Sequence, residues 1–248
     1  MLESLNRLSI ILALHRLKKL IPANNYQVYQ YNNGGMMFIG HYAVGFGLKK
    51  KCSEIPLWLL FLSVQIVDVF AFLFVLLGIE GIKYNPSANP FLRTVIEYVP
   101  YSHSLLTNVL LAIVVFLAVW KMKGKEWGII ISLGVLSHWF LDALVHLPDM
   151  PLFHNSMKVG LGLWRLPWIA FLLELSVFVF AGSYLLRGYR KKKRHVTLML
   201  FLSLGFVLMF FAPEAEATPV MASIMSLSLY TISTAMAYWC DRGGRIRS

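Results

Sequence analysis

The chain has 248 residues, of which 58% are hydrophobic and only 14% are charged. A soluble globular domain carries about 25% charged residues, so this composition excludes an ordinary soluble enzyme and indicates an integral membrane protein. The net charge of +11 would suit a nucleic-acid partner. However, the basic residues lie in short runs between apolar segments, where they orient helices in a membrane. We therefore expect no nucleic-acid partner.

Residues 1–35 differ from the rest of the chain. An amphipathic segment, Leu2 to Ile21, leads into a polar and aromatic run. Its apolar part is too short to span a bilayer, which takes about 20 residues, and no signal-peptide cleavage site follows it. We interpret residues 1–35 as an N-terminal extension outside the fold, either a surface helix or the product of a start site upstream of Met36 or Met37. Residues 36–248 are expected to form a single transmembrane helical domain.

One short and six long apolar segments follow the extension. The short one, Phe38 to Leu48, crosses only about half of the ~30 Å hydrocarbon layer, so it predicts a half-helix. The long ones have about 17 to 23 residues each, the length that a tilted transmembrane helix needs. They are Leu57 to Ile79, Ser104 to Trp120, Trp127 to Leu147, Leu166 to Leu186, Val196 to Ala212 and Pro219 to Cys240. The predicted fold class is all-α: a polytopic integral membrane protein with six transmembrane helices plus a short N-terminal half-helix.

Lysine and arginine predict the orientation of these helices. In a multi-pass protein, every second connection between the apolar segments lies on the same side of the membrane. The connections on one side contain fifteen Lys and Arg residues in all, and those on the other side contain four. The basic set is 49–51, 121–125, 187–194 and the tail from Arg242. Because the side enriched in Lys and Arg is cytoplasmic, we expect the C-terminus in the cytoplasm and loops 80–103, 148–165 and 213–218 outside.

The third long segment carries three ionisable residues at helical spacing. His138, Asp142 and His146 stand four apart, so they fall within about 80° on one helix face. An ionisable side chain at the centre of a membrane helix costs at least ~2.5 kcal/mol on insertion scales, so a partner has to compensate for it. Imidazole and carboxylate suit zinc and other divalent first-row cations. The spacing favours a divalent metal, with zinc as the expected ion, and a proton relay is the alternative.

Further ionisable residues lie at the same predicted depth. Asp68 is in the middle of the first span, and His103 begins the second span on the outer side. His41 lies eight residues before Lys49, so the half-helix would raise it by about 12 Å toward this group. Glu174, in the centre of the fourth span, is the remaining intramembrane carboxylate. The predicted metal ligands are His41, Asp68, His103, His138, Asp142 and His146, and the predicted catalytic residues are Asp68 and Glu174.

Several of these residues also fit a structural role. Asp68 alone could form a hydrogen bond between helices, and His103 could be a polar residue at a helix start. His146 suits a helix end or an outer-shell position, and Glu174 could orient a metal-bound histidine. The remaining histidines of the region, His154 and His195, are expected in loops and in contact with solvent.

A series of short motifs spans residues 37–245. It comprises Phe38-Ile39-Gly40-His41-Tyr42-Ala43, Gln65-Ile66-Val67-Asp68, Tyr101-Ser102-His103-Ser104-Leu105, Leu136-Ser137-His138-Trp139-Phe140-Leu141-Asp142, Val145-His146-Leu147-Pro148-Asp149-Met150-Pro151-Leu152, Lys158-Val159-Gly160-Leu161-Gly162-Leu163-Trp164 and Glu174. This series resembles a bacterial family of predicted membrane-bound metal-dependent hydrolases, which includes a LexA-regulated inner-membrane protein. The resemblance implies a multi-pass protein of the bacterial cytoplasmic (inner) membrane.

That family is distantly similar to the zinc-dependent phospholipase C and P1 nuclease group, in which zinc ions activate water against a phosphodiester. The similarity implies that Asp68, His103, His138 and Asp142 are metal ligands. It also implies that His41 and His146 complete the ligand set of a second ion. The chain departs from that group because it lacks a later His-xxx-Glu pair. In addition, Arg165 stands where we expect Asn in close relatives of this chain. These departures leave the number of ions open.

The sequence thus predicts a membrane-embedded, metal-dependent hydrolase that acts on a phosphoester of a lipid or lipid-linked substrate. Asp68 or Glu174 would accept a proton from water. The competing hypothesis is a non-enzymatic membrane protein, either with a structural metal site or with an ion or proton pathway. A pathway should place polar groups in both halves of the membrane, whereas these residues gather in one half, which favours a site.

Overall fold

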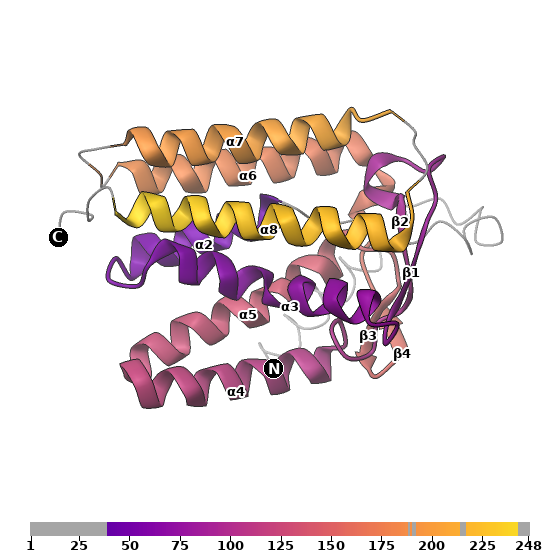
Figure 1. Cartoon of the computed structure of the whole chain (residues 1–248), viewed down its shortest axis with the longest axis horizontal. Helices are drawn as coiled ribbons and strands as arrows, with labels where there is room; N and C mark the ends of the chain where they lie inside the picture. Colours follow the sequence, from indigo (N-terminus) through magenta and orange to yellow (C-terminus); the bar gives the residue numbers. More distant parts are fainter. Residues whose placement is uncertain (1–38, 188, 190–191, 214–216, 243–248) are drawn as a thin grey trace, which may run out of the picture. The chain divides into compact units, whose positions relative to one another are not determined.

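In the computed structural model of the chain, the described residues are 39–187, 189, 192–213 and 217–242. Seven α-helices make up most of this described part (Figure 1). They are α2 (Ile39–Lys51), α3 (Leu57–Leu76), α4 (Leu105–Lys123), α5 (Lys125–Val145), α6 (Pro167–Leu186), α7 (Lys193–Phe210) and α8 (Pro219–Asp241). All except α2 are long and apolar enough to cross a membrane. The prediction of an all-α, multi-pass membrane protein with a short N-terminal half-helix is confirmed. The predicted extension, residues 1–35, lies outside the described residues.

The helices begin and end at recognisable residues. Ser104 caps α4, because its side chain accepts a hydrogen bond from the Thr107 amide, and Thr218 caps α8 in the same way. Gly124 is the only residue between α4 and α5, and its φ of +97° is a conformation that glycine adopts without steric cost. The resulting tight turn makes α4 and α5 close antiparallel neighbours.

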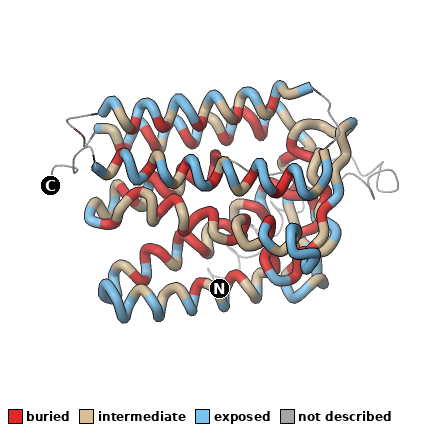
Figure 2. Tube along the Cα trace, in the orientation of Figure 1, coloured by how far each residue is buried: buried red, intermediate tan, exposed pale blue. Residues whose placement is uncertain are grey.

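The burial of the helices follows their place in the bundle. Most of the long helices have a buried stripe and an exposed stripe, whereas α2 is buried along most of its length (Figure 2). The exposed stripes remain apolar, as on α4, where Leu110, Val114 and Leu117 are all exposed. Such surfaces suit contact with lipid tails. α3 and α5 are the most deeply buried of the six long helices and α4 is the least buried. Three of the residues predicted for the site, Asp68, His138 and Asp142, lie on these two most enclosed spans.

Two β-hairpins occupy the loops predicted to lie outside. β1 (Gly81–Tyr84) pairs antiparallel with β2 (Thr94–Tyr98), and β3 (Met150–Phe153) pairs antiparallel with β4 (Ser156–Val159). Short 3-10 helices cover Pro90–Leu92 and Leu163–Arg165. We call this end of the bundle, on the right in Figure 1, the hairpin end. The sequence analysis missed these strands, because strands of four or five residues are too short to show a clear alternation of polar and apolar residues.

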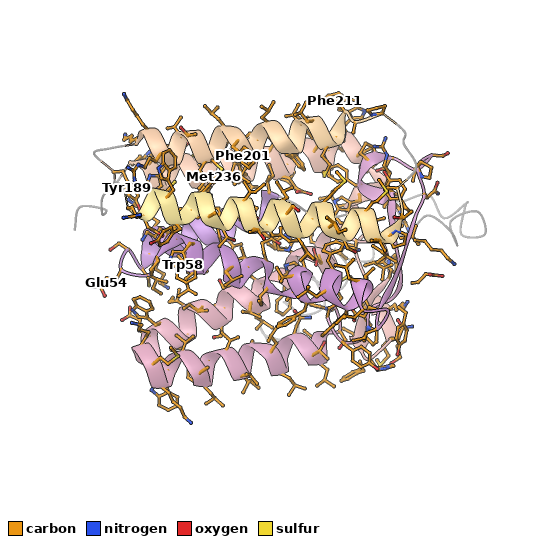
Figure 3. All side chains as sticks on the ribbon, viewed as in Figure 1. Glu54, Trp58, Tyr189, Phe201, Phe211 and Met236 are labelled. Atoms are coloured by element: carbon orange, nitrogen blue, oxygen red, sulfur yellow. The ribbon has the colours of Figure 1, made fainter. Side chains whose placement is uncertain are left out.

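The opposite end, which we call the basic end, carries the basic connections and a buried ion pair. Lys49 Nζ donates to the carbonyl oxygens of Ser53 and Ile55, at 2.9 and 2.8 Å, and lies 3.5 Å from Asp241 Oδ1. The amide of Trp58 donates to Asp241 Oδ2 at 3.2 Å. These contacts join the end of α2 and the start of α3 to the end of α8. Figure 3 labels Trp58 at this end of the bundle.

The prediction that His195 lies in a solvated loop is wrong. His195 is in the first turn of α7 and is buried, with its ring centroid 4.1 Å from that of Tyr189, which Figure 3 labels at the basic end. The apolar run begins only at Val196, but α7 starts three residues earlier at Lys193. The basic residues form the first helical turn, and this turn rotates His195 inward. His154, by contrast, is exposed as predicted.

A close backbone contact holds the end of α5 against the segment that follows β4. The amides of Leu161 and Gly162 donate to the carbonyl oxygens of Ala143 and His146, at 2.9 and 2.7 Å. These carbonyls belong to the last turn of the helix, where no intrahelical partner is available. A Cβ on Gly160 would lie 2.0 Å from the carbonyl oxygen of Leu147. Only glycine fits at position 160 without moving the backbone.

Gly160→Ala is therefore expected to destabilise the protein by about 1 to 3 kcal/mol, the usual cost of overpacking. Gly205→Ala is the matched control, because a Cβ there meets nothing within 4 Å. In the interior of α7 that change should be neutral or should stabilise by up to about 1 kcal/mol. Thermal unfolding in detergent measures both variants, and equal melting temperatures would contradict the close contact.

Candidate metal centre

Four separate elements bring ionisable side chains together near the hairpin end. Asp68 comes from α3, His138 and Asp142 from α5, His41 from α2 and His103 from the loop that precedes α4. All five residues are buried. The helical spacing of His138 and Asp142 is responsible for part of this arrangement, since residues four apart lie on one face. The structure thus brings together five of the six predicted metal ligands in direct contact.

The distances within the cluster suit ligands of one ion. His138 Nε2 lies 3.0 Å from Asp142 Oδ2 and 3.4 Å from Asp68 Oδ1. His103 Nε2 lies 3.3 Å from the same Asp68 oxygen and 3.8 Å from the same Asp142 oxygen. Ligand atoms placed tetrahedrally at about 2.0–2.2 Å from zinc are about 3.3–3.6 Å apart, which falls within the observed range. This buried group could hold a metal ion.

His41 occupies the other side of Asp142. Its Nε2 lies 3.4 Å from Asp142 Oδ1, and its ring centroid is 4.1 Å from that of His138. Two sets of three residues have ligand atoms within 4.8 Å of one another: His41, His138 and Asp142, and Asp68, His103 and His138. Both sets use His138, whose single free nitrogen can bind only one ion. The geometry therefore fits one ion better than two, with His41 at its edge.

The tautomer of His138 gives an independent test of fit. Its Nδ1 lies 2.8 Å from the carbonyl oxygen of Val64. A carbonyl oxygen only accepts, so Nδ1 carries the proton, and in the neutral ring the lone pair of Nε2 faces two carboxylate oxygens. Nε2 is buried and has no hydrogen-bond partner in the described part of the chain. A cation between these three atoms would remove the repulsion, and a backbone carbonyl at the far nitrogen is the usual support for a metal-bound histidine.

Other residues fix the cluster from outside. Tyr230, from α8, donates its hydroxyl to Asp68 Oδ2 at 2.8 Å, which leaves Oδ1 for the two histidines. The sequence analysis missed Tyr230. A signal was present, because Ser223, Ser226, Tyr230 and Ser233 follow one another at intervals of three and four. This spacing places four polar side chains on one face of an otherwise apolar helix, and all four are buried.

The loop that carries His103 is also held firmly. Trp139 Nε1 donates to the carbonyl oxygen of His103 at 3.0 Å. Asn108 Nδ2 donates to the carbonyl oxygens of Ser102 and Ser104, at 2.7 and 2.9 Å. The backbone of residues 102–104 is thus bound to both α4 and α5, and this gives His103 a defined position although it lies outside any helix.

His146 lies beside the cluster and outside both sets of possible ligands. α5 ends at Val145, so His146 has an extended backbone, and its Nδ1 is 3.2 Å from Asp149 Oδ1. Burial alone lowers the pKa of His146. The carboxylates of Asp149, Asp142 and Asp68 outweigh that effect, so its pKa lies above the ordinary value. The prediction that His146 is a metal ligand stays a prediction, and the observed position suits the outer-shell alternative.

Glu174 is separated from the cluster by Trp164. Its Oε1 accepts a hydrogen bond from Trp164 Nε1 at 3.3 Å, and the Trp164 ring packs against His146 with centroids 4.3 Å apart. Glu174 belongs to neither set of possible ligands and is not among the residues that line the adjoining cavity. Its predicted role as a proton acceptor stays a prediction.

A cavity of about 30 Å³ adjoins the cluster. This volume is about that of one water molecule in the liquid. Its polar wall is formed by Asp68, His103, Asp142 and His146, and the other lining residues are Ala71, Phe72, Val75, Ile82, Thr94, Ile96 and Val99. The apolar wall comes from the C-terminal part of α3 and from the β1–β2 hairpin. The hairpin therefore covers the cluster at its end of the bundle.

Comparison of the chain with family models, with curated proteins and with solved structures found no match. The side chains of the cluster and their surroundings are therefore the evidence for function.

Proposed function

We propose that this protein is a metal-dependent hydrolase of the bacterial cytoplasmic membrane that acts on a phosphoester of a lipid or lipid-linked molecule. The observation that carries the proposal is the convergence of two imidazoles and two carboxylates, all buried, beside a water-sized cavity that Asp68, His103 and Asp142 line. Burying ionisable side chains inside an apolar bundle costs free energy. Membrane proteins therefore contain such groups mainly where they bind an ion or a substrate. The motif resemblance to the membrane-bound metal-dependent hydrolases supports the same class.

Zinc is the proposed ion, held by Asp68, His103, His138 and Asp142. Mixed nitrogen and carboxylate ligands suit it, although other divalent first-row ions share this preference. A divalent ion, when bound, polarises a phosphoryl oxygen and lowers the pKa of water to about 7. In the hydrolysis, a new P–O bond forms to the water oxygen and the ester P–O bond breaks. The proton passes to the leaving alkoxide.

Asp68 is the better placed of the two predicted proton acceptors. It borders the cavity, whereas Glu174 does not. The Tyr230 hydroxyl holds one oxygen of Asp68, so the carboxylate cannot rotate away from the cavity. The apolar wall formed by α3 and the hairpin excludes bulk water and offers a surface for a hydrocarbon chain. These features support a substrate with a phosphate group at one end and an apolar chain at the other.

One observation favours a second candidate, a proton path. Polar groups continue beyond Asp68 into the bundle, because Tyr230 donates to Asp68 and the Tyr42 hydroxyl lies 2.5 Å from Ser233 Oγ. A path would conduct protons in liposomes without any divalent ion. A hydrolase should lose its activity when a chelator is added.

The hydrolase proposal is tested with a chromogenic diester, bis-p-nitrophenyl phosphate, and with p-nitrophenyl acetate as a carboxyl ester for comparison. The purified protein should release p-nitrophenol from the diester, and a chelator should abolish this release until Zn²⁺ is restored. Asp142→Asn should be inactive, and His154→Ala, a change at an exposed histidine, should keep full activity. Chelator-resistant cleavage, or equal activity of Asp142→Asn, would contradict the proposal.

The proposed orientation places the hairpin end outside the cytoplasm. Single cysteines at Ser87 and Ser156, both exposed in the hairpin-end loops, should react with an impermeant thiol reagent added to intact cells. A cysteine at Lys192, exposed at the basic end, should react only after permeabilisation. Cys52 is partly exposed, so it is replaced by serine in all three variants. The reverse labelling pattern would invert the topology and place the site near the cytoplasm.

A further inference from the structure

A buried carboxylate outside the cluster is connected to it through a serine. Glu80 lies between α3 and β1 and is buried. Its Oε1 accepts hydrogen bonds from the amides of Tyr101 and Ser102, both at 2.8 Å, and its Oε2 accepts the Ser102 hydroxyl at 2.6 Å. The sequence analysis assigned no role to Glu80 or Ser102. Glu80 directly follows the apolar span Leu57 to Ile79, and an acidic residue at the end of a span has the pattern of one in contact with solvent.

The direction of each hydrogen bond can be assigned. An ionised carboxylate only accepts, so the single hydroxyl proton of Ser102 lies toward Glu80. Ser102 Oγ is also 2.8 Å from His103 Nδ1. Since its proton is already donated to Glu80, this oxygen accepts from His103, and Nδ1 must carry the ring proton. The lone pair of His103 Nε2 then points to the cluster, where it lies 3.3 Å from Asp68 Oδ1.

We propose that Glu80 and Ser102 are positioning residues that hold His103 in the tautomer able to bind a metal ion. This proposal rests on the metal site proposed above. The same arrangement occurs at His138, where the Val64 carbonyl accepts from Nδ1 and leaves Nε2 for the cluster. In both histidines an acceptor behind the ring selects the nitrogen that faces the site, which is the usual outer-shell support for a metal-bound imidazole.

Glu80→Gln is the sharpest test, because it keeps the size of the side chain and changes only its donors. The amide oxygen of Gln can still accept from the two backbone amides, and its NH₂ group then faces Ser102 and donates to Oγ. The hydroxyl proton of Ser102 is then released from Glu80 and can be donated to His103 Nδ1, with the ring proton on Nε2. Glu80→Gln therefore removes the acceptor that selects the metal-binding tautomer and favours the other one. Ser102→Ala removes the connection and enforces neither tautomer, and Ser102→Thr keeps the hydroxyl.

Affinity for Zn²⁺ is measured on the purified full chain by competition with a chromogenic chelator. Glu80→Gln should lower the affinity by about 10- to 100-fold, as loss of outer-shell support does in other metal sites. Ser102→Ala should lower it less, and Ser102→Thr should stay near wild type. Equal losses in Glu80→Gln and Ser102→Ala, together with equally lowered melting temperatures, would show a merely structural role and overturn the proposal.

The tautomer itself is read from ¹⁵N chemical shifts of the histidine rings in the metal-free protein, with the His103 signals assigned by their loss in His103→Gln. Wild type should have the proton on Nδ1, and Glu80→Gln should have it on Nε2. The same tautomer in both proteins would overturn the proposal. This result does not depend on a bound ion. If wild type bound no metal, the proposed function would fail while the tautomer measurement would still decide the role of Glu80.

Discussion

His138→Ala is expected to lower the affinity of the protein for Zn²⁺ by more than about 100-fold, beyond the 10- to 100-fold effect of outer-shell changes. His138 is the residue common to both sets of possible ligands, and its Nε2 contacts a carboxylate oxygen of both Asp68 and Asp142. Without it, each set of three loses one ligand. Competition with a chromogenic chelator measures the affinity, and His154→Ala, at an exposed histidine, serves as the control.

The same variant distinguishes between two hypotheses: a metal site, and a cluster held together by ionised side chains alone. In that competing arrangement, His138 would be a charged imidazolium that donates to Val64 and Asp142 without any metal. Its removal would leave two buried carboxylates unneutralised, and breaking such a buried pair costs about 3 to 5 kcal/mol. If the wild-type protein shows no Zn²⁺ binding and His138→Ala loses stability to this extent, the metal site is refuted.

Trp164→Ala is expected to destabilise the protein by about 3 to 5 kcal/mol, the cost of removing a fully buried large aromatic side chain. Trp164 is 0% exposed. Its ring stacks on Phe91, with centroids 5.8 Å apart and planes 5° apart, and packs against His146. It also donates to Glu174. The side chain thus joins the loop after β4 to α6 and to the end of α5, and its removal should loosen the support of His146.

Unfolding in detergent, followed by near-ultraviolet circular dichroism, measures this loss. Trp120→Ala is the matched control, since Trp120 is 46% exposed near the end of α4. The control should lose much less stability than Trp164→Ala. If the two variants melted alike, the packing of Trp164 between the cluster and α6 would not contribute as described.

The fold was predictable from the sequence because its strongest signals are local. Each span is an apolar run long enough to cross a bilayer. A hydropathy profile identifies such a run from that part of the sequence alone, whatever the neighbouring helices are. The metal cluster was predictable for a related reason. Asp68 and Asp142 are conspicuous because their surroundings are apolar, and a membrane tolerates such residues only where they face a partner.

The parts that were missed depend on contacts between distant residues or on loops. The contact between Tyr230 and Asp68 joins residues 162 positions apart, and no local pattern specifies it. Glu80 directly follows an apolar span, where an acidic residue has the pattern of one in contact with solvent, and only the fold shows that it is buried. Glu174 was selected for its depth in the membrane, but depth does not fix the direction of a side chain, and Glu174 accepts a hydrogen bond from Trp164.

Metal analysis of the purified protein tests the central claim most directly. Wild type, purified without chelators, should contain about one divalent ion per chain, because four ligand atoms suffice for one zinc ion. Asp142→Ala should contain almost none, since Asp142 contacts His41, His103 and His138. His154→Ala should retain the ion. Wild type that remains free of metal after incubation with Zn²⁺, or Asp142→Ala with the wild-type content, would contradict the account.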